Sequence, residues 1–283
     1  MTSDSLLPGW YPLLRARDLR GPPVVRVLAG TSLRIWRESG RIAAVAVASG
    51  AAHRVLEAED WILAAGGDPL TETCASPLLI ATPFRKILIE GRVRAGLGDV
   101  GENILDTTHT SVVHQGYLRR PGSRRPVEAI LEAGAGWISA TYPPGAAPSG
   151  WGARLLGAHR YTIRDTFRAP ATADVSYTDG SRPVFAARFR LSPVTSNETY
   201  VAATIAVPGD GIDAHLKLAA LRLFFRRILA EDRAILELIG ENRAVHGPAP
   251  LIFTPQDLLR PGIEAILAGR CPQVPRPRVG LMV

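Results

Sequence analysis

Cysteine is scarce in this sequence, and long apolar segments are absent from it. The 283 residues include two cysteines, Cys74 and Cys271, which lie far apart and in no CxxC or CxH pattern. Neither a disulfide framework nor a cysteine-held metal cluster follows from such a pair. There is no run of 18 apolar residues, and no basic segment followed by an apolar one at the start. We therefore expect a cytoplasmic protein with no membrane partner.

Lysine is nearly absent as well. Of the 33 lysines and arginines only Lys86 and Lys217 are lysines, and the formal net charge is +7. An excess of arginine with abundant alanine, glycine and proline is more typical of a GC-rich genome than of nucleic-acid binding. No helix-turn-helix and no aromatic-and-basic sheet motif accompanies the basic helical group Arg222, Arg226, Arg227 and Arg233. We expect no nucleic-acid partner, and an acidic partner protein is the better candidate.

The hydrophobic share of 46% and the charged share of 21% indicate a globular chain of one large or two modest domains. Short apolar runs bounded by turn residues predict antiparallel strands at residues 24–28, 33–37, 42–47 and 61–64. This segment is small for an independent core, so we expect it to pack on the rest of the chain. The predicted boundary separates residues 1–68 from residues 69–283.

From about residue 70 the pattern becomes α+β. Strands are predicted at residues 84–94, 136–142, 154–164, 173–177, 184–191 and 199–207. The turn at residues 178–181 joins two of them as a hairpin. Arg188 and Arg190 alternate with Phe189, and we expect both arginines to face solvent; the alternative is that one of them meets a substrate carboxylate. A long amphipathic helix is predicted at residues 213–242.

Two of the six histidines lie in one stretch, in the spacing Asp106-x-x-His109-x-x-x-x-His114. If residues 102–113 are helical, Asp106 and His109 share a face, but His114 lies about 140° further round. Both imidazoles then reach one point only if the helix bends or unwinds, which the intervening Thr, Ser and Val residues favour. Two imidazoles with one carboxylate from elsewhere would complete an Fe(II) facial triad. The alternative is that both histidines are packing or surface residues.

Asp232 is the candidate for the third ligand. It lies in the centre of the apolar stripe of the long helix, formed by Phe225, Ile228, Leu229, Ile235, Leu236 and Ile239. Burying an unpaired carboxylate costs several kcal/mol, so Asp232 needs a cation or strong hydrogen-bond donors. Pairing with an arginine such as Arg85 or Arg164 is the alternative to metal ligation.

These residues resemble a known family. The histidine motif with Asn103 and Asp106, the distant Glu231-Asp232 pair and the opening Gly9-Trp10-Tyr11-Pro12 are similar to the catalytic (alpha) subunit of Rieske non-haem iron oxygenases, in the vanillate O-demethylase-like branch. The resemblance implies one Fe(II) held by His109, His114 and Asp232. It also implies that Asp106 passes electrons to the iron from a neighbouring subunit's cluster, and that its carboxylate is hydrogen-bonded to the His109 ring.

The resemblance further implies a helix-grip (START/SRPBCC-like) fold for residues 69–283, with an antiparallel sheet around the long C-terminal helix. Members of the family commonly form trimers, so a homo- or hetero-oligomer of that type is expected. The departure lies in the first strands, which in the family lead into Cys-x-His and Cys-x-x-His pairs that hold a [2Fe–2S] cluster. Here residues 45–61 contain no such pair. We therefore interpret residues 1–68 as a truncated Rieske-like β remnant without cluster ligands.

The expected function is that of an iron oxygenase subunit that hydroxylates or oxidatively demethylates a small aromatic or apolar substrate. Its electrons would come from a Rieske cluster on a separate Rieske, ferredoxin or reductase protein, with NAD(P)H only an indirect source. One alternative is a catalytically silent helix-grip subunit that partners a full-length oxygenase or binds a small apolar ligand. Another is redox-neutral iron chemistry that needs no electron relay.

Overall fold

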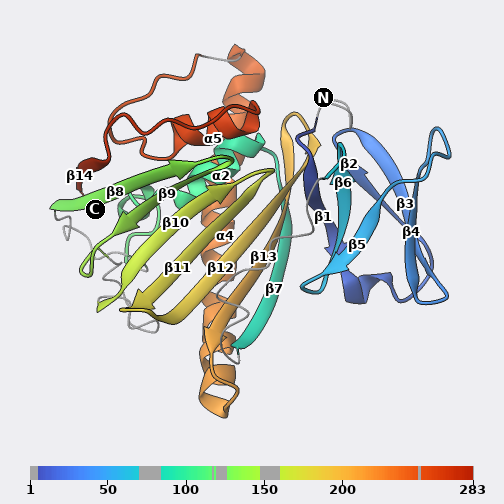
Figure 1. The fold of residues 1–283 in the computed structure, drawn as a ribbon, viewed down its shortest axis with the longest axis horizontal. Coiled ribbons are helices and arrows are strands. Elements are labelled where there is room, and N and C mark those ends of the chain that lie inside the picture. Colours follow the sequence, from blue (N-terminus) through green and yellow to red (C-terminus); the bar gives the residue numbers. More distant parts are fainter. Residues whose placement is uncertain are drawn as a thin grey trace.

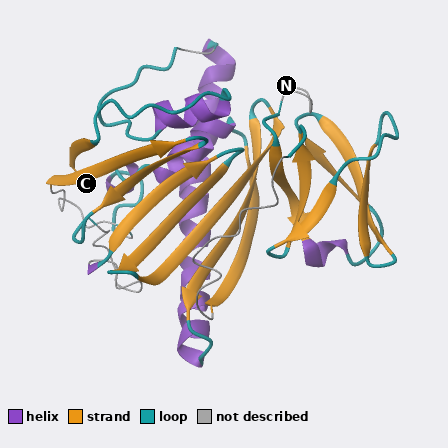
Figure 2. Ribbon diagram, viewed as in Figure 1, coloured by secondary structure: helices purple, strands orange, loops and turns teal. Residues whose placement is uncertain are grey.

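A large antiparallel sheet dominates the fold, which is mixed α and β with few helices (Figures 1 and 2). The computed structural model describes residues 6–69, 84–116, 118, 126–146, 160–247 and 250–282. The sheet has eight strands in the order β14-β8-β9-β10-β11-β12-β13-β7. These strands are β7 (Phe84–Val93), β8 (Pro126–Gly134), β9 (Trp137–Tyr142), β10 (Thr162–Arg168), β11 (Thr172–Asp179), β12 (Arg182–Thr195), β13 (Glu198–Pro208) and β14 (Arg278–Met282).

The helices lie on and beside one face of this sheet (Figure 1). The long helix α4 (Ile212–His246) crosses the face, and the short helices α2 (Leu97–Leu105) and α5 (Arg260–Leu267) lie next to each other at one end of the sheet. A 3-10 turn, η3 (His109–Ser111), follows α2. None of the helices in the described ranges has the length and apolar character needed to span a bilayer.

Two small antiparallel sheets precede the large one. The first contains β1 (Gly9–Arg15), β6 (Trp61–Gly66) and β5 (Val55–Ala58), and the second contains β2 (Val24–Leu28), β3 (Thr31–Glu38) and β4 (Arg41–Ala46), with a 3-10 turn η2 (Ala16–Leu19) beside them. Strands β1 and β2 pack against β12 and β13 of the large sheet. Across this contact the buried indole Nε1 of Trp61 donates a 2.9 Å hydrogen bond to Thr204 Oγ1. The expectation that this segment packs on the rest is confirmed, while a domain boundary at residue 68 stays a prediction.

The expectation that Arg188 and Arg190 face solvent is wrong. Each is 5% exposed. Arg190 Nη1 lies 2.6 Å from Glu59 Oε2, and Arg188 Nε donates a 2.7 Å hydrogen bond to Asp174 Oδ1. The N-terminal sheets cover this face of β12, while Phe189 lies on the opposite face, toward α4, so the strand is buried on both sides.

The strand predictions hold for most of the chain, including the hairpin between β11 and β12. The strand predicted at residues 154–164 is displaced, because β10 begins at Thr162, and residues 154–159 lie outside the described part of the chain. The long helix is confirmed and extends further at its C-terminal end. The predicted apolar stripe is wrong in part, since Ile235 and Ile239 are 38% and 39% exposed.

Candidate metal centre and substrate pocket

The two histidines of the motif follow the end of α2 instead of lying within it. The helix considered over residues 102–113 is not continuous, and the chain unwinds before the first histidine: α2 ends at Leu105, and Asp106 has an extended backbone, with ψ of 107°. The Asp106 carboxylate accepts hydrogen bonds from the backbone N–H groups of Thr108 (2.7 Å) and His109 (3.1 Å). A side chain that caps the residues after it competes with continued helix, and here it starts the turn that carries His109.

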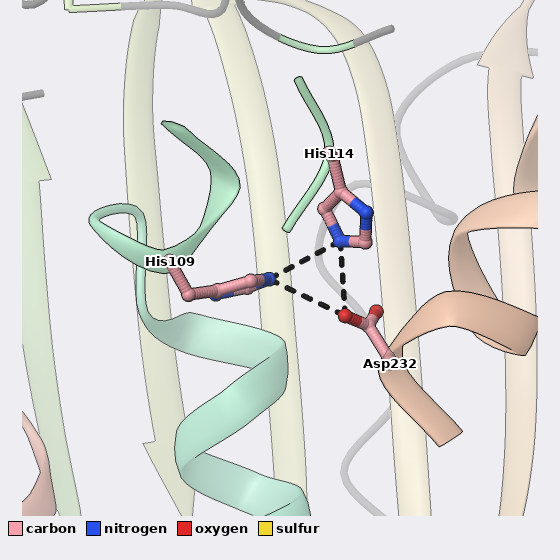
Figure 3. A group of neighbouring side chains, drawn as sticks. All are labelled: His109, His114 and Asp232. Atoms are coloured by element: carbon pink, nitrogen blue, oxygen red, sulfur yellow. Dashed lines mark hydrogen bonds and ion pairs between the residues drawn. The ribbon is translucent and has the colours of Figure 1, made fainter. Parts of the chain in front are cut away.

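This turn brings both rings to the carboxylate of Asp232 on α4 (Figure 3). The distance between His109 Nε2 and His114 Nε2 is 3.3 Å. Asp232 Oδ1 lies 2.9 Å from His114 Nε2 and 3.4 Å from His109 Nε2. The three side chains are mostly buried, with His114 at 1%, Asp232 at 14% and His109 at 17% exposure.

The triangle has the size expected around one metal ion. Donors on one face of an octahedral ion, with bonds of about 2.1 Å, lie about 3.0 Å apart, and donors at tetrahedral corners lie about 3.4 Å apart. A meridional arrangement would place one pair about 4.2 Å apart, which the observed edges of 2.9, 3.3 and 3.4 Å exclude. Asp232 Oδ1 is also a buried acceptor without a hydrogen bond of good geometry among the described residues. The residues therefore fit a divalent ion held by two imidazoles and one carboxylate.

A second carboxylate orients one of the rings. Glu231 Oε2 lies 2.9 Å from His114 Nδ1, on the side of the ring away from Asp232, and Glu231 Oε1 accepts from Arg227 Nε at 3.0 Å. A proton held on Nδ1 leaves Nε2 with its lone pair directed at the triangle. The sequence-based prediction gave Glu231 no role.

The charges of the group are mutually stabilising. Burial lowers the pKa of His114, but the hydrogen bonds and charges of Asp232 and Glu231 outweigh burial and raise it above the ordinary value. Burial raises the pKa of Asp232, and the two imidazoles outweigh that effect, so it lies below the ordinary value. Asp232 is thus ionised at neutral pH, as a metal-ligating carboxylate must be.

Neither of the two arginines named as alternative partners pairs with Asp232. Arg85 donates to the backbone oxygen of Asp210 at 2.8 Å, and Arg164 bonds to Glu132 and Ser139. The histidines His215 and His246 are exposed, as expected of surface residues, and His159 lies outside the described residues.

Asp106 lies beside the triangle without joining it. Its Oδ2 is 3.8 Å from His109 Nδ1, so the expected hydrogen bond between this carboxylate and the ring is not formed. The Asp106 side chain is 32% exposed and borders both the pocket of the triad and two neighbouring hollows. It therefore stands between the candidate metal centre and the surface.

The triad forms one end of a mainly apolar pocket between α4 and the sheet. Aromatic rings make up much of its wall: Phe185 stacks with Phe225 at 6.1 Å between centroids and lies 5.2 Å from Tyr177. Phe189, Phe224 and Ile163 complete this wall, and Asp165 is a polar exception on the sheet. Such a pocket suits a small apolar or aromatic molecule.

A buried ionic cluster fixes the helices that present the ligands. Asp99 on α2 accepts hydrogen bonds from Arg260 Nη2 on α5 at 2.9 Å and from Arg243 on α4. Arg260, 7% exposed, also pairs with Glu102 and with Glu264 at 2.8 Å. Because α2 leads to the histidines and α4 carries Asp232, this cluster sets the distance between the two sources of ligands.

The fold and the His-His-Asp group together define a class, that of non-haem iron oxygenase catalytic domains, and comparison with known proteins supports it. The sequence profile of the vanillate O-demethylase oxygenase C-terminal domain matches residues 93–258, more than half of the chain. The chain belongs to that family, which confirms the resemblance drawn from the motif. A comparison with functionally curated proteins finds no match.

Solved structures that are similar to this chain include oxygenases. Dicamba monooxygenase bound to dicamba is similar with a TM-score of 0.75 at 18% identity, over 94% of this chain and 97% of that one. The Pseudomonas putida protein NdmB gives a TM-score of 0.64 at 12% identity, over 97% and 96% of the two chains. A carbazole-bound oxygenase, in a ferredoxin complex of carbazole 1,9a-dioxygenase, gives 0.66 at 11% identity, over 94% and 90%. At these identities the likeness shows a shared fold.

Proposed function

We propose that this protein is a non-haem Fe(II) oxygenase catalytic subunit that hydroxylates or oxidatively demethylates a small aromatic or apolar substrate. The observation that carries the proposal is the triangle of His109, His114 and Asp232, whose edges have the size expected around one metal ion. Iron(II) held by these residues would supply the activation of dioxygen. Two neutral imidazoles and one carboxylate would hold such a divalent ion with a net positive charge.

The protein's own residues would position the substrate and keep water away from it. The aromatic wall formed by Tyr177, Phe185 and Phe225 adjoins the triad, so a flat apolar ring placed against it lies beside the ligands. Membership of the vanillate O-demethylase family and the likeness to dicamba monooxygenase support this substrate class. The same proposal includes a helix-grip fold, in which α4 lies within the curve of the sheet.

Electrons would enter from another protein. The sequence has two cysteines and no Cys-x-His pair, which supports the view that the [2Fe–2S] cluster lies on a separate Rieske or ferredoxin partner. The similar carbazole oxygenase was solved in complex with a ferredoxin. Asp106, which borders both the triad's pocket and the outer hollows, is the residue proposed to lie on the electron path.

Anaerobic Fe(II) reconstitution followed by an iron assay tests the metal site. Roughly one iron per chain is expected for the wild type and for the control His215→Ala, whose exposed histidine is also on α4, while His109→Ala and Asp232→Ala lose it. A wild-type content below a few tenths of an iron per chain refutes the proposal.

Asp106→Ala should keep the iron but lose turnover with a Rieske partner and reductase. Full activity of a partner oxygenase co-expressed with His109→Ala would favour a catalytically silent subunit instead.

A further inference from the structure

One carboxyl group in the pocket has no role in the metal site. Asp165 lies on β10, is 2% exposed, and borders the same pocket as the triad. In the sheet it is flanked by Ala140 of β9 and Val175 of β11, and Val175 is followed by Ala187 of β12. Asp165 is therefore the polar member of an otherwise apolar row that lines the pocket.

Within the described part of the chain, one oxygen of this side chain has no partner. Asp165 Oδ1 is buried and has no hydrogen-bond partner among the described residues. Burial, with the nearby negative charge of Asp106, raises the pKa of Asp165 well above its ordinary value. Burial in that setting favours the neutral carboxyl group, which presents one O–H donor and one accepting oxygen.

We propose that Asp165 is the polar anchor of this pocket and donates a hydrogen bond to an acceptor oxygen or nitrogen on a neutral aromatic substrate. The inference rests on the proposed function, since it takes the pocket as the oxygenase's substrate site. An unsatisfied buried polar group is costly, and a ligand that supplies its partner recovers that cost upon binding. The row Ile163, Asp165 and Phe167 shares one face of β10, so the anchor lies on the sheet wall, across the pocket from Asp232 on α4.

With Asp165 in its wall, the pocket discriminates between ligands by their hydrogen-bond acceptors as well as by their shape. A ligand with a carbonyl, ether or ring-nitrogen acceptor satisfies the Asp165 O–H, whereas a hydrocarbon of the same shape leaves it unpaired. One neutral hydrogen bond contributes about 1 kcal/mol net, so the two ligands should differ by at least about fivefold in affinity. A substrate anchored there would have a fixed edge against the sheet and its opposite edge toward the triad.

The test compares two probes of nearly equal shape, acetophenone and isopropenylbenzene, which differ by a carbonyl oxygen in place of a methylene group. Both are titrated by calorimetry into the full chain, as purified and after Fe(II) reconstitution. The wild type should bind acetophenone at least about fivefold more tightly than isopropenylbenzene. Asp165→Asn, which keeps a donor and an acceptor, should retain that preference, and Asp165→Leu should abolish it. Equal binding of the two probes by the wild type, or an unchanged preference in Asp165→Leu, overturns the proposal.

A second measurement depends neither on the Asp165→Leu variant nor on bound iron. Infrared difference spectroscopy should show the C=O stretch of a protonated carboxyl group at neutral pH, and acetophenone should shift it. The band should be absent from Asp165→Asn and unchanged in the control Asp179→Asn, whose aspartate lies exposed in the β11–β12 turn. A wild type without the band, or a band that acetophenone leaves in place, refutes the anchor. The iron assay reports separately on the triad, so failure of the metal site is distinguished from failure of the anchor.

Discussion

Replacing Glu231 should weaken iron binding although Glu231 is not itself a proposed ligand. Its carboxylate lies 2.9 Å from His114 Nδ1 and so fixes which nitrogen of the ring carries the proton. In Glu231→Ala the ring loses this acceptor, and the tautomer with Nε2 directed at the triangle is no longer favoured. The negative charge that makes the imidazole a better donor is lost at the same time.

The expected loss of iron affinity follows from the kind of contact that Glu231 makes and from the exposure of its side chain. Loss of a carboxylate behind a metal-binding histidine typically costs about 10–100-fold in affinity, or roughly 1.4–2.7 kcal/mol. The Glu231 side chain is 29% exposed, so solvent screening places the expected loss near tenfold. Glu231→Gln keeps a carbonyl acceptor and loses only the charge, so a smaller loss of about fivefold is expected.

Anaerobic competition with a chelator of known Fe(II) affinity measures these differences directly. The matched control is Glu237→Ala on the same helix, because Glu237 pairs with Arg233 four residues earlier, at 2.9 Å, as Glu231 pairs with Arg227. The control removes the same charge and a similar ion pair without touching His114. Wild-type affinity in Glu231→Ala, or an equal loss in Glu237→Ala, would refute the reasoning.

Three further predictions concern stability and are measured by urea or thermal unfolding. Asp99→Asn should lower the free energy of unfolding at pH 7 by about 1.5–3 kcal/mol, because the buried Arg260 loses one of its three carboxylate partners and Arg243 loses its charged partner. Burial raises the pKa of Asp99, but its two arginines outweigh burial and lower it. The stabilisation is therefore complete above pH 3.8 and is lost as the pH falls through the folded-state pKa, where wild type and variant should converge. Gly240→Ala should destabilise by about 1–3 kcal/mol despite the better helix propensity of alanine, since its Cβ would lie 2.6 Å from the backbone oxygen of Arg94; an unchanged melting temperature contradicts this. Thr204→Val should cost about 1–2 kcal/mol by leaving the buried Trp61 indole N–H unpaired, and a neutral effect would show that this bond contributes nothing.

The convergence of ligands was predictable because it depends on residue types and on one strong periodic pattern. The apolar periodicity around Asp232 placed a carboxylate on a face turned toward the core, and the stretch with His109 and His114 offered the partners. The position at which α2 ends, Leu105, was harder to predict from the sequence. It depends on the Asp106 carboxylate accepting from the two backbone N–H groups of Thr108 and His109, a local competition that periodicity does not register.

Other features could be identified only from the tertiary structure. Alternation in β12 separates Phe189 from Arg188 and Arg190 but does not distinguish an arginine in solvent from one paired with Glu59 of another sheet. For Asp165 a signal was present, since it alternates with Ile163 and Phe167 and must share their buried face. The strand predicted at residues 154–164 stopped one residue short of it, so that signal was missed.

The turn after α2 determines both the approach of the two histidine rings and the position of Asp106. In a helix through residue 113, His114 would lie about 140° round from His109, and the two rings would not reach one ion. Ending the helix at Leu105 brings the rings to within 3.3 Å and leaves Asp106 at the corner between the triad's pocket and the outer hollows. The carboxylate that caps the turn is thus also the one proposed to lie on the electron path. A substitution at Asp106 therefore tests the proposed electron path, and iron content measured alongside turnover shows whether the histidine geometry is retained.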